Sequence, residues 1–203
     1  MSKRRATSND TSFATGLLHR RVFPSELTSP ANTTPVFIAD SLDLGTADLP
    51  RTPGKVWATE VLKVNYQFDN AEVDATSKNV MWTIGLSTSN ASSITTYLGA
   101  APNVSKMWLV DQILDTATLR YQIVVNSTTA AAMYYSPLEV EHELTDLMGR
   151  GLLVFSGQLY LLSASTSSDQ ITTLSCAVEV WFRYVQVPLE YYLSIAQRSE
   201  EHT

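Results

Sequence analysis

Residues 171–187 form the longest segment of regular alternation in this chain, and they constrain its fold more than any other segment. Apolar or aromatic side chains take every second position there: Leu174, Cys176, Val178, Val180, Phe182 and Tyr184. Successive side chains of a β-strand point to opposite faces, so a period of two over this length predicts one long, half-buried strand. Pro188 ends the run.

Shorter runs of the same kind predict eight or nine strands in all, joined by polar loops and without a convincing long helix. The clearest covers residues 56–69, in which apolar and polar side chains alternate. The others lie at 36–39, 80–87, 118–125, 133–144, 152–155 and 159–162, whereas 106–114 fits a strand or a short helix. Because Ser156-Gly157 separates two of these runs, they predict a β-hairpin. Such spacing favours a sandwich, a barrel or a jelly roll.

The composition fits one all-β domain. The chain has 203 residues, and 44% of them are hydrophobic, which is enough for a real core. No run approaches the roughly 18 apolar residues of a membrane-spanning helix, so we expect no membrane partner. The start, MSKRR, lacks a following apolar segment and does not read as a secretory signal. The single cysteine, Cys176, excludes an internal disulfide and is interpreted as a small buried residue, not as a nucleophile.

Charge is distributed unevenly along the chain, whose net charge is -6. Five of the 14 Lys and Arg residues precede Pro24, together with one of the 20 acidic residues. The five are Lys3, Arg4, Arg5, Arg20 and Arg21. We interpret residues 1–34 as a weakly basic N-terminal arm that neutralises phosphates of a nucleic acid without reading its sequence. An ordinary solvated tail is the alternative, and charge favours neither of the two.

The residues that catalysis or metal binding needs are sparse. Two of the three histidines, His19 and His202, lie in the terminal segments, and no hydrolase, metalloprotease or nucleotide-loop motif is present. We therefore predict no catalytic residue, no metal and no cofactor. Glu139, Glu141 and Glu143 alternate along one predicted strand and share a face. They fit a cation site, such as calcium at a subunit boundary, or a solvated face that protects an edge strand, and we favour the second interpretation.

The segment from Asp146 onward carries a recognisable set of motifs. Asp146, Gly149, Gly151 and Leu153 form a D-x-x-G-x-G-x-L segment ahead of two apolar runs. The last strand and the tail add Phe182, Arg183, Val187, Leu189, Glu190, Tyr191 and Ile195. This C-terminal part resembles the capsid proteins of small circular Rep-encoding single-stranded DNA viruses, and the strand at 61–68 resembles their E-V-[LY]-K-V strand. About a third of the chain carries the resemblance.

The resemblance implies a single jelly roll of two four-stranded antiparallel sheets over residues 35–187, between the arm at 1–34 and a tail at 188–203. It implies that many copies pack into an icosahedral shell, with the arm facing the genome. The tail, one helical turn or an extended segment, would contact a neighbouring copy through Leu189, Tyr191, Tyr192 and Ile195. The expected partners are other copies and viral nucleic acid, and the expected locations are the virion and the host cell interior during assembly. The weakly basic arm departs from the long Arg/Lys-rich arm of many such proteins.

Three other functions are compatible with some of these features. A coat protein of a small RNA virus is one, because a basic arm does not distinguish RNA from DNA. A jelly-roll module that binds a carbohydrate or a receptor is another, although it has no need of a basic N-terminus. A cupin-like metalloenzyme is the third, and it requires a cluster of histidine and carboxylate ligands that His142 alone does not supply.

Overall fold

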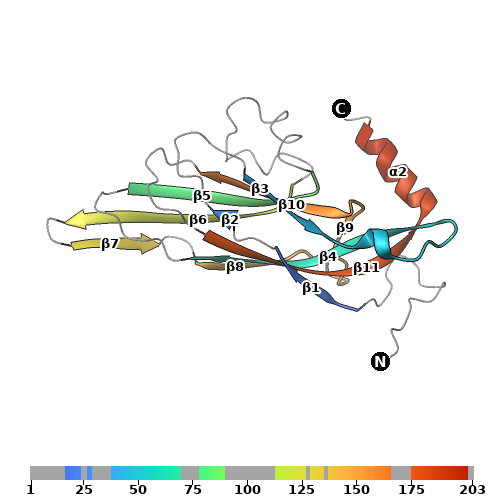
Figure 1. The fold of residues 1–203 in the computed structure, drawn as a ribbon, viewed down its shortest axis with the longest axis horizontal. Coiled ribbons are helices and arrows are strands. Elements are labelled where there is room, and N and C mark those ends of the chain that lie inside the picture. Colours follow the sequence, from blue (N-terminus) through green and yellow to red (C-terminus); the bar gives the residue numbers. More distant parts are fainter. Residues whose placement is uncertain are drawn as a thin grey trace.

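Two antiparallel β-sheets lie face to face in the computed structural model of this chain (Figure 1). The structure describes residues 17–23, 27–28, 38–69, 78–89, 113–126, 129–134, 137–165 and 175–200. Sheet A contains β1 (His19–Val22), β2 (Leu27–Thr28), β4 (Lys55–Phe68), β8 (Glu139–Glu143), β9 (Leu152–Val154) and β11 (Ser175–Pro188). Sheet B contains β3 (Ile38–Asp43), β5 (Lys78–Ser87), β6 (Ile113–Asn126), β7 (Thr129–Tyr134) and β10 (Gln158–Ser165). A 3₁₀ turn, η1 (Thr46–Asp48), and one helix, α2 (Leu189–Glu200), complete the described elements.

The strand order identifies a jelly roll. Sheet A runs β1-β11-β4-β8, with β2 continuing β1 beside β11 and β9 continuing β8 beside β4. Sheet B runs β3-β10-β5-β6-β7. We count β1 with β2 as one strand, count β8 with β9 as one strand, and leave β7 aside. The strands then pair from the outside inward: the first with the last, the second with the second-last, and so on to the β5–β6 pair in the middle. This nested pairing, split over two sheets, confirms the predicted jelly roll, and β7 adds a fifth strand to sheet B.

The core lies between the two sheets and draws on both of them. Its largest fully buried side chains are Trp82, Tyr66, Phe182, Leu44, Ile84, Leu86, Leu119 and Leu159. The indole of Trp82 donates its N–H to the hydroxyl of Ser163 at 2.7 Å, so this polar atom is satisfied inside the core. In β11, Cys176, Val178, Val180 and Phe182 are all fully buried. The alternation that predicted a long half-buried strand is therefore confirmed in β11.

The alternation of β11 ends at Tyr184, because the other face of the strand is covered there. Val185 and Val187 are buried with Ala58 in a second, smaller cluster, against which Leu153 and Phe155 pack. The register between β4 and β11 also shifts between Trp181 and Phe182, where β4 contributes one additional residue. A bulge of this kind bends and twists the strand locally.

The predicted hairpin across Ser156-Gly157 is wrong. β9 pairs with β4 in sheet A, whereas β10 pairs with β3 and β5 in sheet B. The chain therefore crosses from one sheet to the other between Val154 and Gln158. The carbonyl of Gly157 accepts a hydrogen bond from the amide of Leu44, which fixes this crossing to the end of β3. A Gly-containing turn between apolar runs looks the same in sequence whether it closes a hairpin or crosses a sandwich.

The folded part begins earlier than the boundary predicted at residue 34, whereas β11 ends at Pro188, where the tail was predicted to begin. β1 and β2 lie within residues 1–34 and pair with β11, and Phe23 between them is buried in the core. At the other end the tail is a 12-residue helix and not a single turn. The amide of Leu189 donates to the carbonyl of Gly54 at 3.0 Å where α2 begins. Figure 1 shows α2 standing away from the two layers.

Candidate functional site

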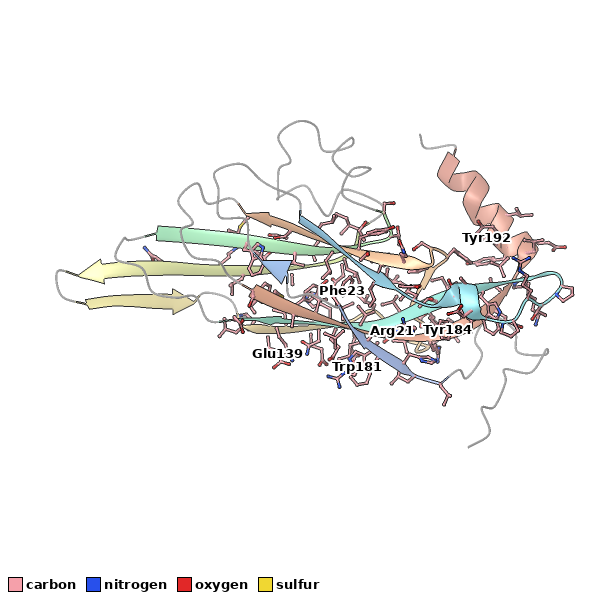
Figure 2. All side chains as sticks on the ribbon, viewed as in Figure 1. Arg21, Phe23, Glu139, Trp181, Tyr184 and Tyr192 are labelled. Carbon is pink, nitrogen blue, oxygen red and sulfur yellow. The ribbon has the colours of Figure 1, made fainter. Side chains whose placement is uncertain are left out.

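The face of sheet A that points away from the core carries a row of alternating charges. Arg20 in β1 forms an ion pair with Glu179 in β11, and Lys63 in β4 forms one with Glu141 in β8. Trp181 lies between the two cations, with the Arg20 and Lys63 charges 5.5 and 5.6 Å from its ring centre. Figure 2 shows Trp181 and Glu139 on this outer side and Phe23 between the layers. The hydrogen bond from Arg20 is the main reason that the pKa of Glu179 is lowered.

The five basic residues predicted to contact nucleic acid fall into two groups. Arg20 is engaged with Glu179, and the guanidinium of Arg21 donates to the carbonyl of Asp43 in sheet B. Arg21 thereby links β1 to the opposite sheet, near the hydroxyl of Tyr184, which donates to the carbonyl of Leu44. Lys3, Arg4 and Arg5 lie outside the described residues. The structure therefore gives Arg20 and Arg21 partners within the chain.

His19 lies at the same end of the sandwich, on the core side of β1. Its ring stacks on Phe182 with ring centres 5.5 Å apart and meets the Tyr184 ring at 4.8 Å. Burial, and then the positive charge of Arg21, lowers the pKa of His19 below its ordinary value of 6.5. The neutral form of this histidine is the one that the packing favours.

A third ion pair on the outer face of sheet A, between Arg183 and Glu60, lies beneath a loop. Arg183 donates through Nε to Glu60, whose side chain is 1% exposed. Glu60 also accepts the amide of Gly151 at 2.8 Å, and Arg183 reaches the carbonyl of Gly149 at 3.3 Å. A Cβ atom on Gly151 would lie 2.1 Å from the carbonyl oxygen of Val61. The loop therefore approaches β4 more closely than a residue with a side chain would permit. The hydrogen bond to Glu60 raises the pKa of Arg183.

The loop itself is held by the first residue of the D-x-x-G-x-G motif. Asp146 accepts hydrogen bonds on one carboxylate oxygen from the amides of Met148 and Arg150, at 2.8 and 2.9 Å. Gly149 follows in the left-handed region, with φ of 71°. The hydrogen bond from the Arg150 amide is the main reason that the pKa of Asp146 is lowered. Asp146, Gly149, Gly151 and Arg183 therefore belong to one connected structural unit.

The glutamates of β8 are exposed and spread along an edge of sheet A. Glu139 accepts a hydrogen bond from the amide nitrogen of Asn65, and Glu141 pairs with Lys63. Within the described residues, no three His, Cys, Asp or Glu side chains come together as ligands for a metal ion. The two residues between these glutamates face the core side. His142 places Nδ1 2.9 Å from both carboxylate oxygens of Asp115, and so ties β8 to β6 of the other sheet.

Helix α2 presents part of the predicted subunit-contact set to solvent. Leu189 and Tyr191 are exposed, as is Leu193, whereas Tyr192 packs its ring on Phe155 with 5.1 Å between ring centres. The side chain of Ile195 lies outside the described residues. Among the residues that the structure describes, no helix combines the length and the apolar character that crossing a membrane takes.

Two further exposed apolar groups were missed by sequence reasoning. Leu147 and Met148 sit at the tip of the Asp146 loop with 107% and 73% exposure, and Leu17 and Leu18 precede β1 with 68% and 56%. The available signal was the pair Leu147-Met148 inside a stretch of turn-forming residues, where a solvated loop is ordinarily polar.

No protein-family model matches this chain, and no curated protein sequence matches it. Solved structures do. The VP1 pentamer of human polyomavirus 6 is 13% identical, with 92% of this chain and 98% of that chain covered and a TM-score of 0.41. The unassembled VP1 pentamer of KI polyomavirus is 11% identical, with 93% and 98% covered and a TM-score of 0.41. The structure of tomato aspermy virus is 13% identical, with 89% and 88% covered and a TM-score of 0.38. These likenesses concern the fold alone, which the strand order already establishes.

Proposed function

We propose that this chain is a capsid protein, which assembles with many copies of itself into an icosahedral shell around a single-stranded DNA genome. The observation that carries the proposal is the surface of helix α2. This helix leaves the jelly roll after Pro188 and exposes Leu189, Tyr191 and Leu193 to solvent. Exposed apolar side chains do not stabilise the single folded chain, whereas their burial against a second copy stabilises an assembly.

The motif residues of the Asp146 loop support the same proposal. They were the basis of the resemblance to capsid proteins of circular single-stranded DNA viruses, and they are joined to Glu60 and Arg183 by hydrogen bonds. This network explains why those residue types occur at those positions, since each one has a partner or a close approach that requires it. In such a shell the chain is located in the virion, and in the host cell interior while particles form.

Of the five predicted nucleic-acid contacts, Arg20 and Arg21 have partners within the chain, so the proposal is tested on Lys3, Arg4 and Arg5. Three cations per copy neutralise few phosphates, but a shell multiplies them by its number of copies. Replacing all three with alanine is expected to flatten the dependence of binding on salt, by roughly 2 in the slope of log K against log salt for a single strand. Arg51→Ala, which changes an exposed cation of the body, is the matched control and is expected to leave the slope unchanged.

The assembly itself is tested on the purified full chain. Size-exclusion chromatography and negative-stain electron microscopy over a range of salt and pH are expected to show discrete, closed particles. DNase but not RNase is expected to degrade nucleic acid released from particles made in infected or co-expressing cells. A chain that stays monomeric under every condition would rule out the shell. Contents that RNase degrades would mean that the genome is RNA and not DNA.

A further inference from the structure

The two opposite edges of sheet A complement each other, and we propose that neighbouring copies join through them. In this arrangement the β1 edge of one copy lies against the β8/β9 edge of the next. The inference rests on the proposed assembly and adds to it which surfaces meet. β1 and β8 are at the two ends of the order β1-β11-β4-β8, and in the described part of the chain each pairs with a strand on one side only.

The β1 edge is apolar and basic. Leu17 and Leu18 lead into the strand and Val22 ends it, with 68%, 56% and 51% exposure. Arg20 lies between them, and 59% of its side chain is exposed even though it is paired with Glu179. A partner surface for this edge therefore needs apolar side chains next to carboxylates.

The β8/β9 edge has those properties. Glu139, Glu141 and Glu143 are exposed along β8. The Asp146 loop between β8 and β9 then presents Leu147 and Met148 to solvent, and Leu152 at the start of β9 is 38% exposed. The loop is held by the Asp146 carboxylate and by Glu60 and Arg183 beneath it. Its apolar tip is therefore preorganised and loses little freedom on binding.

The apolar and charged parts of the two edges also lie at matching levels along the strands. Pairing across the sheet connects Arg20 through Trp181 and Lys63 to Glu143. One position along, it connects His19 through Phe182 and Val61 to Leu152. A copy moved sideways across the sheet thus brings Arg20 to the glutamates of β8. The same movement brings the apolar residues before His19 to the level of β9, beside the Asp146 loop.

Strand direction agrees with this contact. Two strands, β11 and β4, lie between the two edge strands, and each neighbouring pair is antiparallel, so β1 and β8 run in opposite directions. A second copy in the same orientation consequently continues the antiparallel order across the junction. The contact joins two different surfaces, so repetition produces a ring where the rotation closes. Pairing two β8 edges instead would place glutamates against glutamates, which is destabilising.

The test uses two variants of the full chain, each of which disables one edge. Leu18→Asp places a carboxylate on the β1 edge, and Met148→Asp places one on the loop tip. Each variant alone is expected to associate at least about tenfold more weakly than the wild type, because a carboxylate in an apolar contact loses its hydration. A mixture of the two retains one intact pair of edges and is expected to form one-to-one heterodimers that grow no further. Native mass spectrometry resolves these species.

Leu17→Asp and Leu147→Asp form a second pair that repeats the test on neighbouring positions. Ala47→Asp in η1 adds the same charge to an exposed position of another element and is expected to assemble as the wild type does. Circular dichroism confirms that each variant is folded. Wild-type assembly that persists in Leu18→Asp and Met148→Asp would overturn the edge contact and leave the shell standing. A wild type that never assembles would overturn both.

Discussion

Two Arg–Glu pairs on the outer face of the same sheet have different environments. Arg183 and Glu60 lie under the Asp146 loop, with side-chain exposures of 21% and 1%, whereas Arg20 and Glu179 have exposures of 59% and 14%. The covered pair accepts and donates further hydrogen bonds with the loop backbone, whereas the open pair lies beside Trp181, whose indole donates to Glu179. We therefore expect the contribution of each arginine to the free energy of unfolding to depend on whether the loop covers its ion pair.

Arg183→Ala should have the largest effect on stability. It leaves the carboxylate of Glu60 buried without its counter-charge, which costs about 3–5 kcal/mol of the free energy of unfolding. The double variant Arg183→Met with Glu60→Gln removes both charges and keeps an acceptor for Gly151, so it should lose less. Urea denaturation of the unassembled chain measures both. A loss no greater than that of Arg20→Ala would remove the distinction between the two pairs.

Gly151→Ala tests whether the loop needs its close approach to β4. The added Cβ would meet the carbonyl oxygen of Val61 at 2.1 Å, so the loop must move and the bond from Gly151 to Glu60 weakens. The expected cost is about 2–4 kcal/mol. Gly149→Ala is the matched control, since no atom of the described residues lies within 4 Å of the added Cβ, and its φ of 71° opposes the change at about 1–2 kcal/mol. Equal losses would show that the approach is not tight.

Arg20→Ala should lower the stability of the isolated subunit only slightly. Its guanidinium is open to water, and an ion pair of that kind is weakened by competing solvent and by salt. Urea midpoints of the wild type and the variant are expected to converge as salt is raised to about 1 M. A difference that persists at high salt would mean that Arg20 contributes through packing on Trp181 and not through charge.

The smallest expected effect is a change in how stability depends on pH. The pKa of His19 is lowered in the folded chain, so between that pKa and 6.5 the unfolded chain binds more protons. Stability from this group is therefore complete above 6.5 and decreases as pH falls through that window. His19→Phe keeps a ring against Phe182 and Tyr184 and should flatten the pH dependence of stability below the ordinary histidine pKa of 6.5. An unchanged slope of stability against pH would mean that the dependence comes from another titrating group.

Alternation predicted the strands of this fold well, and it failed where contacts come from distant residues. β4 and β11 were recognisable because one face of each is buried over many residues. The burial of Val185 and Val187 was not, since it depends on Leu153 and Phe155, which arrive from another strand. The crossing between β9 and β10 was missed for the same reason. Turn residues report a change of direction and say nothing about which sheet comes next.

The candidate site shows the same difference between what local sequence patterns predict and what distant contacts decide. Arg20 and Arg21 were predicted as phosphate contacts from charge alone, and the structure gives them Glu179 and the Asp43 carbonyl as partners. These partners lie in strands far from β1 in sequence, so no local pattern predicts them. Exposed Leu189 and Tyr191 were predicted as contact residues, and that role remains a prediction. The motif at Asp146 was noticed as a resemblance, but its hydrogen bonds to Glu60 and Arg183 appear only in three dimensions.

The reaction rate of the single thiol of the chain reports on local opening of the fold. Cys176 is fully buried in β11, where it pairs with Phe68 of β4 on one side and Leu27 of β2 on the other. A thiol reagent reaches it only when β2 or the end of the sandwich opens, so the rate of modification measures that opening. If subunits in a particle hold one another closed, the same thiol should react more slowly there than in free chains. The rate of this one reaction then follows disassembly in real time.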